Sequence, residues 1–336
     1  MKNKQIDSKN LMFQMYRLMN RIRFFERAAY ELYMEGELPG FMHISIGQEA
    51  TAVGACSALQ KEDFMGSTHR GHGDTIAKGV EIGAAMSELF GKRTGACKAK
   101  GGSMHISDFS KGILGANGIV AAGVPIATGA ALSMKMQKKD HVVLCFFGDG
   151  AFASGPVHEC LNVSSLWKLP IIYIRQNNQY AESTPKKEYM GVPDIVQWAQ
   201  SYGMPARRVD GNDVLDVYEN VLKAAKFARE GNGPTFIESE TYRWYGHNIG
   251  DPGLGRPKEE VEQWKKRDPI PKFRKYILDN AIASEEELLQ IEKEEENGIQ
   301  EAIQQAQNAQ YPGLNEALEN VYSDETLGSM AIRGVR

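Results

Sequence analysis

Residues 141–150 read HVVLCFFGDG, and residues 170–178 read PIIYIRQNN. Each stretch begins as a continuous apolar run, which is typical of a parallel strand buried on both faces, and each ends in polar residues. The sequence between them predicts a helix over residues 156–167, and a crossover of about 30 residues is the usual length of one β-α-β unit. The two stretches therefore predict neighbouring parallel strands, with Asp149 and Asn178 at the same edge of a sheet.

The alternation of helices and strands continues on both sides of this unit. A small-residue helix is expected from about residue 119, and Gly- and His-rich loops with short helices precede it. The downstream sequence predicts helices over 194–202 and 213–229 and strands over 207–209 and 234–240. Amphipathic helices are expected near the ends, over 8–36 and 284–307. We predict an α/β fold with a doubly wound parallel sheet, in which residues 1–310 form one domain and residues 311–336 form a C-terminal tail.

Composition argues against several classes of function. The 336 residues contain 39 Lys and Arg against 43 Asp and Glu, and no basic block stands out, so nucleic acid is not an expected partner. The longest apolar run, residues 120–132, is interrupted by Gly and Pro and is shorter than a membrane span, and residues 1–10 lack the apolar core of a secretory signal. The four cysteines form no CxxC pair. We therefore expect reduced thiols and a cytoplasmic protein without a membrane partner.

The polar strand ends carry the strongest chemical signal. Asp149 and Asn178 supply carboxylate and amide oxygens, the ligands that a hard cation such as Mg²⁺ prefers. Glycines on both sides of Asp149 would let a phosphate approach the backbone. The pattern predicts a cation bridging to a diphosphate.

This pattern resembles the signature of thiamine-diphosphate enzymes, and further motifs extend the resemblance. The sequence reads KGGSMH at 100–105, GANGIV at 115–120, LWKLP at 166–170 and TYRWYGH at 241–247. Together they are similar to the alpha subunit of the decarboxylating component of 2-oxo acid dehydrogenase complexes, over about residues 10–310. STHRGHG at 67–73 is more similar to the acetoin dehydrogenase branch than to the pyruvate branch. The resemblance implies the diphosphate-binding half of a thiamine-diphosphate-binding fold.

The resemblance also implies roles for individual residues. Mg²⁺ would be held by the side chains of Asp149 and Asn178 and by the backbone carbonyl of Tyr180. The residues implied to contact thiamine diphosphate are Gly150 and Ala151 at the diphosphate, Gly118 and Val120 at the aminopyrimidine ring, Arg70 at a phosphate, and His69 and His247. The candidates for proton transfer and for holding substrate or lipoyl oxygens are His43, His69 and His247.

The resemblance further implies partners. In this family the glutamate that activates the cofactor comes from another domain, and the sequence contains no second doubly wound unit. A beta subunit is therefore expected, in an α2β2 heterotetramer, and the acyl unit would pass to a lipoyl acyltransferase component. Acetoin, pyruvate and branched 2-oxo acids all remain possible substrates.

Two other functions stay open at this stage. A split transketolase-like subunit would use the same cofactor without a lipoyl partner. A non-catalytic assembly paralogue is suggested by residues 151–155, which read AFASG where the family usually has a small residue followed by Asn-Gln-Gly. The histidines themselves give little reason to expect zinc, because the sequence has no HExxH-type pair.

Overall fold

The computed structural model describes residues 8–192 and 194–320. Its main sheet has six strands in the order β2-β1-β3-β4-β8-β7, and every pair of neighbours is parallel. The strands are β1 (Phe64–Gly66), β2 (Ile113–Gly115), β3 (Val143–Gly148), β4 (Ile171–Asn177), β7 (Ala206–Asp210) and β8 (Thr235–Glu240). The predicted α/β fold with a doubly wound parallel sheet is confirmed.

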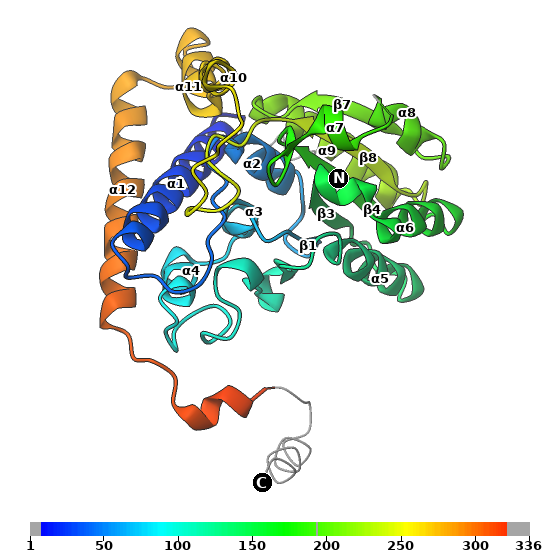
Figure 1. Ribbon diagram of the computed structural model, residues 1–336. Helices are drawn as coiled ribbons and strands as arrows, with labels where there is room; N and C mark the ends of the chain where they lie inside the picture. Colours follow the sequence, from blue (N-terminus) through cyan, green and yellow to red (C-terminus); the bar gives the residue numbers. More distant parts are fainter. Residues whose placement is uncertain (1–7, 193, 321–336) are drawn as a thin grey trace, which may run out of the picture.

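Helices cover both faces of this sheet. Figure 1 shows α5 (Gly123–Met136) and α6 (Gly155–Leu166) on one side, opposite α1 (Ser8–Met34), α2 (Glu49–Ser57), α3 (His72–Lys78) and α4 (Ile82–Leu89). Alternate residues of β3 enter different cores: Leu144 and Phe146 join the α1 side, whereas Cys145 and Phe147 join the α5 side. A strand buried on both faces needs an apolar side chain at every position, which explains the unbroken runs in the sequence.

The remaining elements follow the same plan. On the α1 side, α9 (Val214–Arg229) packs against α2 and β4. On the α5 side, α8 (Ile195–Gln200) contacts β7 and β8 and adds Ile195 and Ala199 to that core. The shorter elements are η1 (Ser103–His105), η2 (Phe109–Lys111), η3 (Gly150–Ala153), β5 (Tyr180–Ala181), β6 (Thr184–Pro185), α7 (Lys186–Tyr189), α10 (Lys258–Lys265), α11 (Pro269–Asp279) and η4 (Leu314–Leu318).

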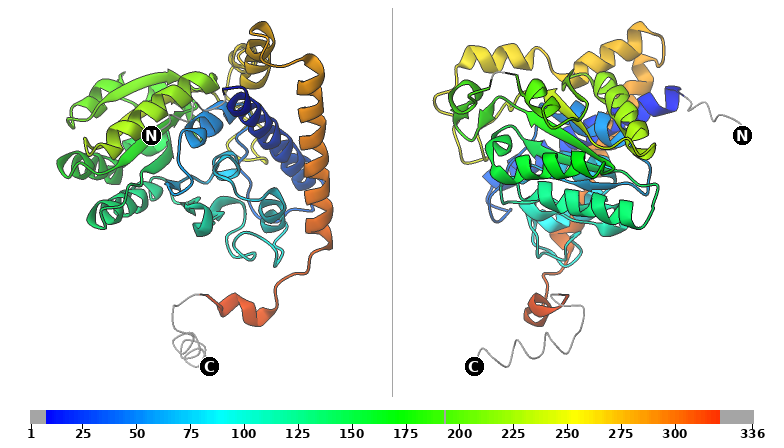
Figure 2. Two further views of the ribbon diagram at one scale, coloured as in Figure 1. Left: turned by 180° about the vertical axis from the view of Figure 1, so that it is seen from behind. Right: turned by 90° about the vertical axis from the view of Figure 1, so that its right-hand side faces the viewer.

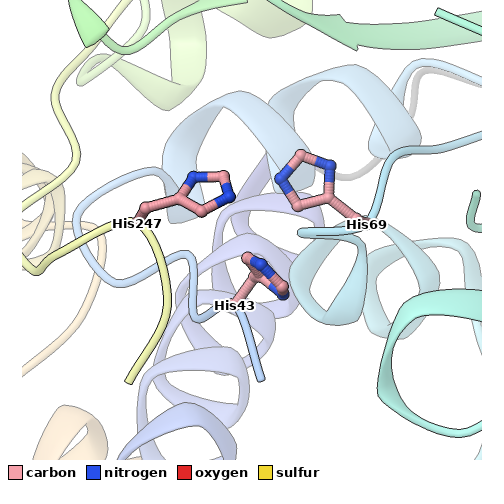
Figure 3. A group of neighbouring side chains, drawn as sticks. All are labelled: His43, His69 and His247. Carbon is pink, nitrogen blue, oxygen red and sulfur yellow. The ribbon is translucent and has the colours of Figure 1, made fainter. Parts of the chain in front are cut away.

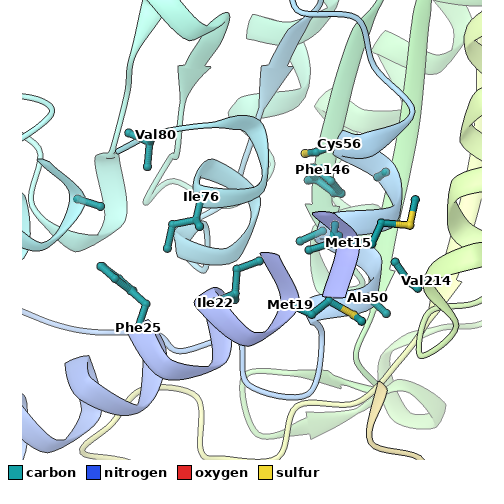
Figure 4. Packing of buried hydrophobic residues seen from close by; sticks show 14 of the residues in the cluster. Met15, Met19, Ile22, Phe25, Ala50, Cys56, Ile76, Val80, Phe146 and Val214 are labelled. Carbon is teal, nitrogen blue, oxygen red and sulfur yellow. The ribbon is translucent and has the colours of Figure 1, made fainter. Parts of the chain in front are cut away.

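The first and last long helices lie side by side. Helix α12 (Glu285–Asn308) packs against α1 and α4, and the left view of Figure 2 shows it beside α1. Glu295 of α12 is 4% exposed and accepts hydrogen bonds from Arg17 and Arg21 of α1. The apolar face of α1, which includes Met15, Met19, Ile22 and Phe25, is fully buried within the chain (Figure 4).

Two expectations need correction. The small-residue helix begins at Gly123 rather than near residue 119, because Ala121 has a φ of +69°, which a right-handed helix does not allow. The region before Gly118 contains the strands β1 and β2 in addition to short helices. Each has only three residues, too few to show a strand pattern.

Three other predictions concern the ends and the surface. The structure describes the predicted C-terminal tail only as far as residue 320, so a domain boundary at residue 310 stays a prediction. Of residues 1–10, which lack the apolar core of a secretory signal, it describes only residues 8–10. Among the described residues, none of the helices combines the length and the apolar character that crossing a bilayer requires. All four cysteines are free.

Candidate active site

Asp149 and Asn178 meet at the carboxyl edge of the sheet, as the strand pattern predicts. The pairing of β3 with β4 brings Gly148 opposite Gln176, so the residues that follow both strands emerge together. Both side chains are buried. Asp149 accepts a hydrogen bond through Oδ1 from the Gly150 backbone N–H at 3.0 Å, whereas Oδ2, near Tyr189, has no hydrogen-bond partner among the described residues.

Burial dominates the electrostatics of Asp149. Burial raises the pKa of this carboxyl, although the Arg175 guanidinium opposes the shift. A buried carboxylate oxygen without a partner is costly, and a bound cation would remove the cost. The donor set of a carboxylate and an amide therefore fits Mg²⁺.

The backbone around Asp149 and Asn178 leaves room for a ligand to approach closely. The antiparallel pair β5–β6 follows Asn178, and Tyr180 donates its backbone N–H to Asn178 Oδ1 at 3.3 Å. A Cβ at Gly150 would lie 2.7 Å from the Cβ of Ala181, so glycine is the residue that fits there. Gly148 has no atom within 4 Å of where a Cβ would lie, which leaves its surroundings open.

A cavity of about 300 Å³ joins this corner to the loops that follow β1 and β8. It lies where the chain moves in opposite directions across the sheet, between β1 and β3, which is the usual ligand site of a doubly wound fold. Nine of the predicted site residues line it: His69, Arg70, Val120, Asp149, Gly150, Ala151, Asn178, Tyr180 and His247. Gly118 and His43 do not line it. The N–H of Gly118 donates to Nε2 of His105 at 3.2 Å.

The three candidate catalytic histidines gather beside the cavity. His43 precedes α2, His69 follows β1, and His247 follows β8, and Figure 3 shows the three rings converging. The ring centroid of His43 lies 4.8 Å from that of His69 and 4.8 Å from that of His247. Burial and the nearby Arg70 guanidinium lower the pKa of His43 to about 3, of His69 to about 2 and of His247 to about 4. All three rings are therefore neutral near pH 7.

Arg70 holds two of these loops together. Its Nη1 donates to the carbonyl of Ile44 at 2.7 Å, and its Nη2 donates to the carbonyl of His247 at 2.8 Å. Burial and Arg243 lower the pKa of Arg70 to about 9. The arginine expected at a phosphate thus also positions the backbone beside His43 and at His247.

Other histidines have structural partners. His72 is completely buried between Glu26 (3.0 Å) and Ser103 (2.9 Å). The same Glu26 accepts hydrogen bonds from the backbone N–H and the hydroxyl of Ser45, two residues after His43. His158 packs against Phe152 and Trp198. These rings support the site from outside the cavity.

Comparison with known proteins agrees with this geometry. A family model described as the dehydrogenase E1 component matches residues 16–315. The chain belongs to this family. It is 44% identical to the alpha subunit of the acetoin:2,6-dichlorophenolindophenol oxidoreductase of Bacillus subtilis over 317 residues, which cover 94% of this chain and 95% of the relative. The subunit of the same name from Cupriavidus necator is 41% identical over 315 residues, with 94% and 95% covered. The pyruvate dehydrogenase E1 component subunit alpha of Porphyra purpurea is 39% identical over 324 residues, with 94% of each chain covered.

Membership of the E1 family confirms the resemblance, and the structure gives Phe152 of the unusual segment 151–155 a role in the core. Phe152 is fully buried on the α5 side of the sheet. Its ring packs edge-on to Phe236 and Trp198. Phe152 therefore fills the core beneath the site, whereas Ala153 and Gly155 are exposed, and Gly150 and Ala151 still line the cavity.

The sequence indicates Arg243 as a candidate anion contact in the segment after β8, but it does not indicate Gln176 or Asp74 at this E1 cavity. Arg243 lines the wall and donates to the carbonyl of Glu182, and Gln176 lines it while donating to buried Asp74. The TYRWYGH motif contained Arg243, but nothing in the sequence showed which way its side chain would point. Burial raises the pKa of Asp74 to about 7, and this could not be foreseen without the fold.

Proposed function

We propose that the protein is the alpha subunit of a thiamine-diphosphate-dependent dehydrogenase that cleaves acetoin or decarboxylates a 2-oxo acid such as pyruvate. The acyl unit would then pass to a lipoyl acyltransferase. The observation that carries the proposal is the meeting of Asp149 and Asn178 with His69 and His247 around one cavity, in a chain of the E1 family. His43 lies against both of these rings.

The residues of the cavity suit the cofactor. Asp149, Asn178 and the carbonyl of Tyr180 would hold Mg²⁺, and the backbone of Gly150 and Ala151 would meet the diphosphate. Arg70 and Arg243 bring two guanidinium groups to the same cavity, which favours an anion there. When bound, thiamine diphosphate supplies the carbanion chemistry that breaks a bond next to a carbonyl.

The protein's own residues would orient the reactants and move protons. Val120, Val124, Phe146 and Phe147 give the cavity apolar walls, which exclude water and strengthen the polar contacts inside. His43, His69 and His247 are neutral near pH 7, so each ring nitrogen that carries a lone pair can accept a hydrogen bond. As proton acceptors they would be weak bases until bound substrate or cofactor raises their pKa values. Arg70 would keep His43 and His247 in place through the carbonyls it binds.

A beta subunit is part of the proposal. The described residues form one doubly wound sheet, so the group that activates the cofactor is expected from another chain, in an α2β2 assembly. Ile119, Val120 and Ile126 are 70%, 57% and 50% exposed beside the cavity, and a partner that covers them would also close the site. Four free thiols suit a reducing compartment such as the cytoplasm.

The experiment compares the chain alone with the chain co-expressed with a beta subunit. Acetoin, pyruvate, a branched 2-oxo acid and a ketose phosphate are each supplied with 2,6-dichlorophenolindophenol as the electron acceptor. We expect no turnover by the chain alone, and turnover of acetoin or a 2-oxo acid by a stable hetero-oligomer. Robust turnover by a verified single-chain preparation would contradict the alpha-subunit proposal. Turnover of the ketose phosphate alone would favour the transketolase alternative, and a hetero-oligomer that binds no cofactor would favour the assembly paralogue.

A further inference from the structure

The histidine cluster has a second property that the dehydrogenase reaction does not require. Each ring offers one nitrogen, and the three nitrogens all lie within 4.8 Å of one another. Nδ1 of His43 and Nδ1 of His247 are buried without a hydrogen-bond partner among the described residues. Figure 3 shows one nitrogen of His247 and one nitrogen of His69 facing each other above the His43 ring. Buried ring nitrogens beside one another are suited to a shared ligand.

We propose that His43, His69 and His247 form a binding site for a late divalent transition metal such as Zn²⁺ or Co²⁺, distinct from the oxygen-ligand corner at Asp149. Three imidazoles that leave a fourth position open are a known zinc arrangement. In a tetrahedral site with Zn–N near 2.1 Å, the nitrogens lie about 3.4 Å apart. Nitrogens that lie 4.8 Å apart would have to approach each other by about 1.4 Å on metal binding.

The chemistry of the ligands distinguishes the two sites. Imidazole nitrogen suits Zn²⁺ and Co²⁺, whereas Mg²⁺ requires oxygen ligands in an octahedral arrangement. The rings are already neutral near pH 7, because burial and Arg70 keep their pKa values low, so a metal need not displace protons. We therefore expect the cluster to bind transition metals in the presence of excess Mg²⁺.

The charges around the cluster limit its strength and select the fourth ligand. Arg70 and Arg243 act on all three rings with positive charge, and Glu182 and Asp251 act on His247 with negative charge. Two guanidinium groups next to a dication weaken its binding. An anion such as hydroxide or chloride in the open position would offset them, so the site should bind more weakly than a closed four-ligand zinc site.

Metal binding would have a consequence for the proposed enzyme. A metal held by all three rings occupies the nitrogens that the proposed reaction uses, so Zn²⁺ should inhibit turnover. The binding itself does not depend on the proposed function, because it concerns the chain without cofactor. Failure of one proposal is thus distinguishable from failure of the other.

The test uses Co²⁺ as the probe and the full chain at neutral pH in excess Mg²⁺. Co²⁺ titration followed by visible absorption should show one equivalent with the intense d–d bands of four-coordinate cobalt. The single variants His43→Gln, His69→Gln and His247→Gln should each weaken binding at least 10-fold. His141→Gln, altered at the opposite end of the sheet, is the matched control and should bind as the wild type does.

Two further spectroscopic measurements identify the atoms that bind the metal. Zinc-edge X-ray absorption of the wild type should show three imidazole nitrogens, even if a variant fails to fold. Cys97 is the one cysteine that is not buried, and sulfur-to-cobalt charge-transfer bands would reveal binding there instead. The proposal is overturned by the absence of stoichiometric binding, by sulfur ligation, or by binding that survives the loss of any single ring.

Discussion

The two halves of the candidate site are held in place by different means. Asp149 and Asn178 follow neighbouring strands, so the hydrogen bonds of the β3–β4 ladder set their separation. His43, His69 and His247 lie on three loops, and the contact that joins two of those loops is Arg70. The strand-end half is therefore rigid without its ligand, whereas the geometry of the histidine half depends on a few side-chain hydrogen bonds.

The largest expected effect concerns the strand-end half. Asp149→Asn removes the charge that faces the cation, and we expect Mg²⁺-dependent binding of thiamine diphosphate to weaken roughly 1000-fold, or about 4 kcal/mol. The melting temperature should change little, because the ladder remains. Isothermal titration measures the affinity, and Asp140→Asn, an exposed carboxyl just before the same strand, is the control. Near-wild-type affinity in Asp149→Asn would remove the metal role from this residue.

A somewhat smaller effect should follow from disrupting the histidine half. Arg70→Ala leaves the carbonyls of Ile44 and His247 without their donor, and we expect the free energy of unfolding to fall by roughly 3 kcal/mol. Denaturant titration gives this value, and Arg207→Ala on the exposed side of β7 should cost less than about 0.5 kcal/mol. If Arg70→Ala proved as stable as the control, the loops would be held by other contacts and the contrast between the two halves would weaken.

The histidines should also make stability depend on pH. Their folded pKa values lie below the unfolded value of about 6.5, so between pH 6.5 and about 4 the unfolded chain binds more protons. Stability should therefore fall as the pH decreases through this window. His43→Gln should reduce the loss between pH 7 and pH 5 by about 1 kcal/mol, a value lowered by solvent screening of the partly exposed cluster. Unfolding titrations at the two pH values measure it, and His141→Gln should retain the contribution of the cluster.

The smallest effect concerns the segment after β8. Residues 242–257 contribute Arg243 and His247 to the cavity, and Leu254 in the same segment is 81% exposed. Bound cofactor should oppose opening of this loop, so thermolysin cleavage before Leu254 should slow several-fold with thiamine diphosphate and Mg²⁺. Cleavage before Leu314, which is 96% exposed and lies outside this segment, is mapped by mass spectrometry as the internal control. Equal rates at Leu254 with and without cofactor would show that the loop does not respond to it.

The same contrast explains what the sequence could predict. The strand runs and the spacing of 29 positions from Asp149 to Asn178 follow general rules for one crossover, so the sheet and its strand-end residues were predictable. The histidines are separated by 26 and 178 residues in the chain, and no local pattern brings them together. Their place in the site came from the family resemblance.

Other features depend on tertiary contacts that no pattern contains. The sequence could not show that Arg70 binds two backbone carbonyls, or that Glu26 holds both Ser45 and His72. Ala121 interrupts the helical pattern through its own backbone angle, although alanine is a strong helix former. In each case packing of distant segments overrides a local preference.

The pairing of α1 with α12 has a consequence for how the chain folds during synthesis. The ion pair between Arg17 and Glu295 joins residues that are 278 positions apart, so one flank of the first helix stays uncovered until nearly the whole chain has left the ribosome. At about 5–20 residues per second, this interval lasts roughly 15–60 s. Throughout it, part of the α1 surface is available to chaperones, and a chain truncated before residue 285 should aggregate rather than accumulate as a stable fragment.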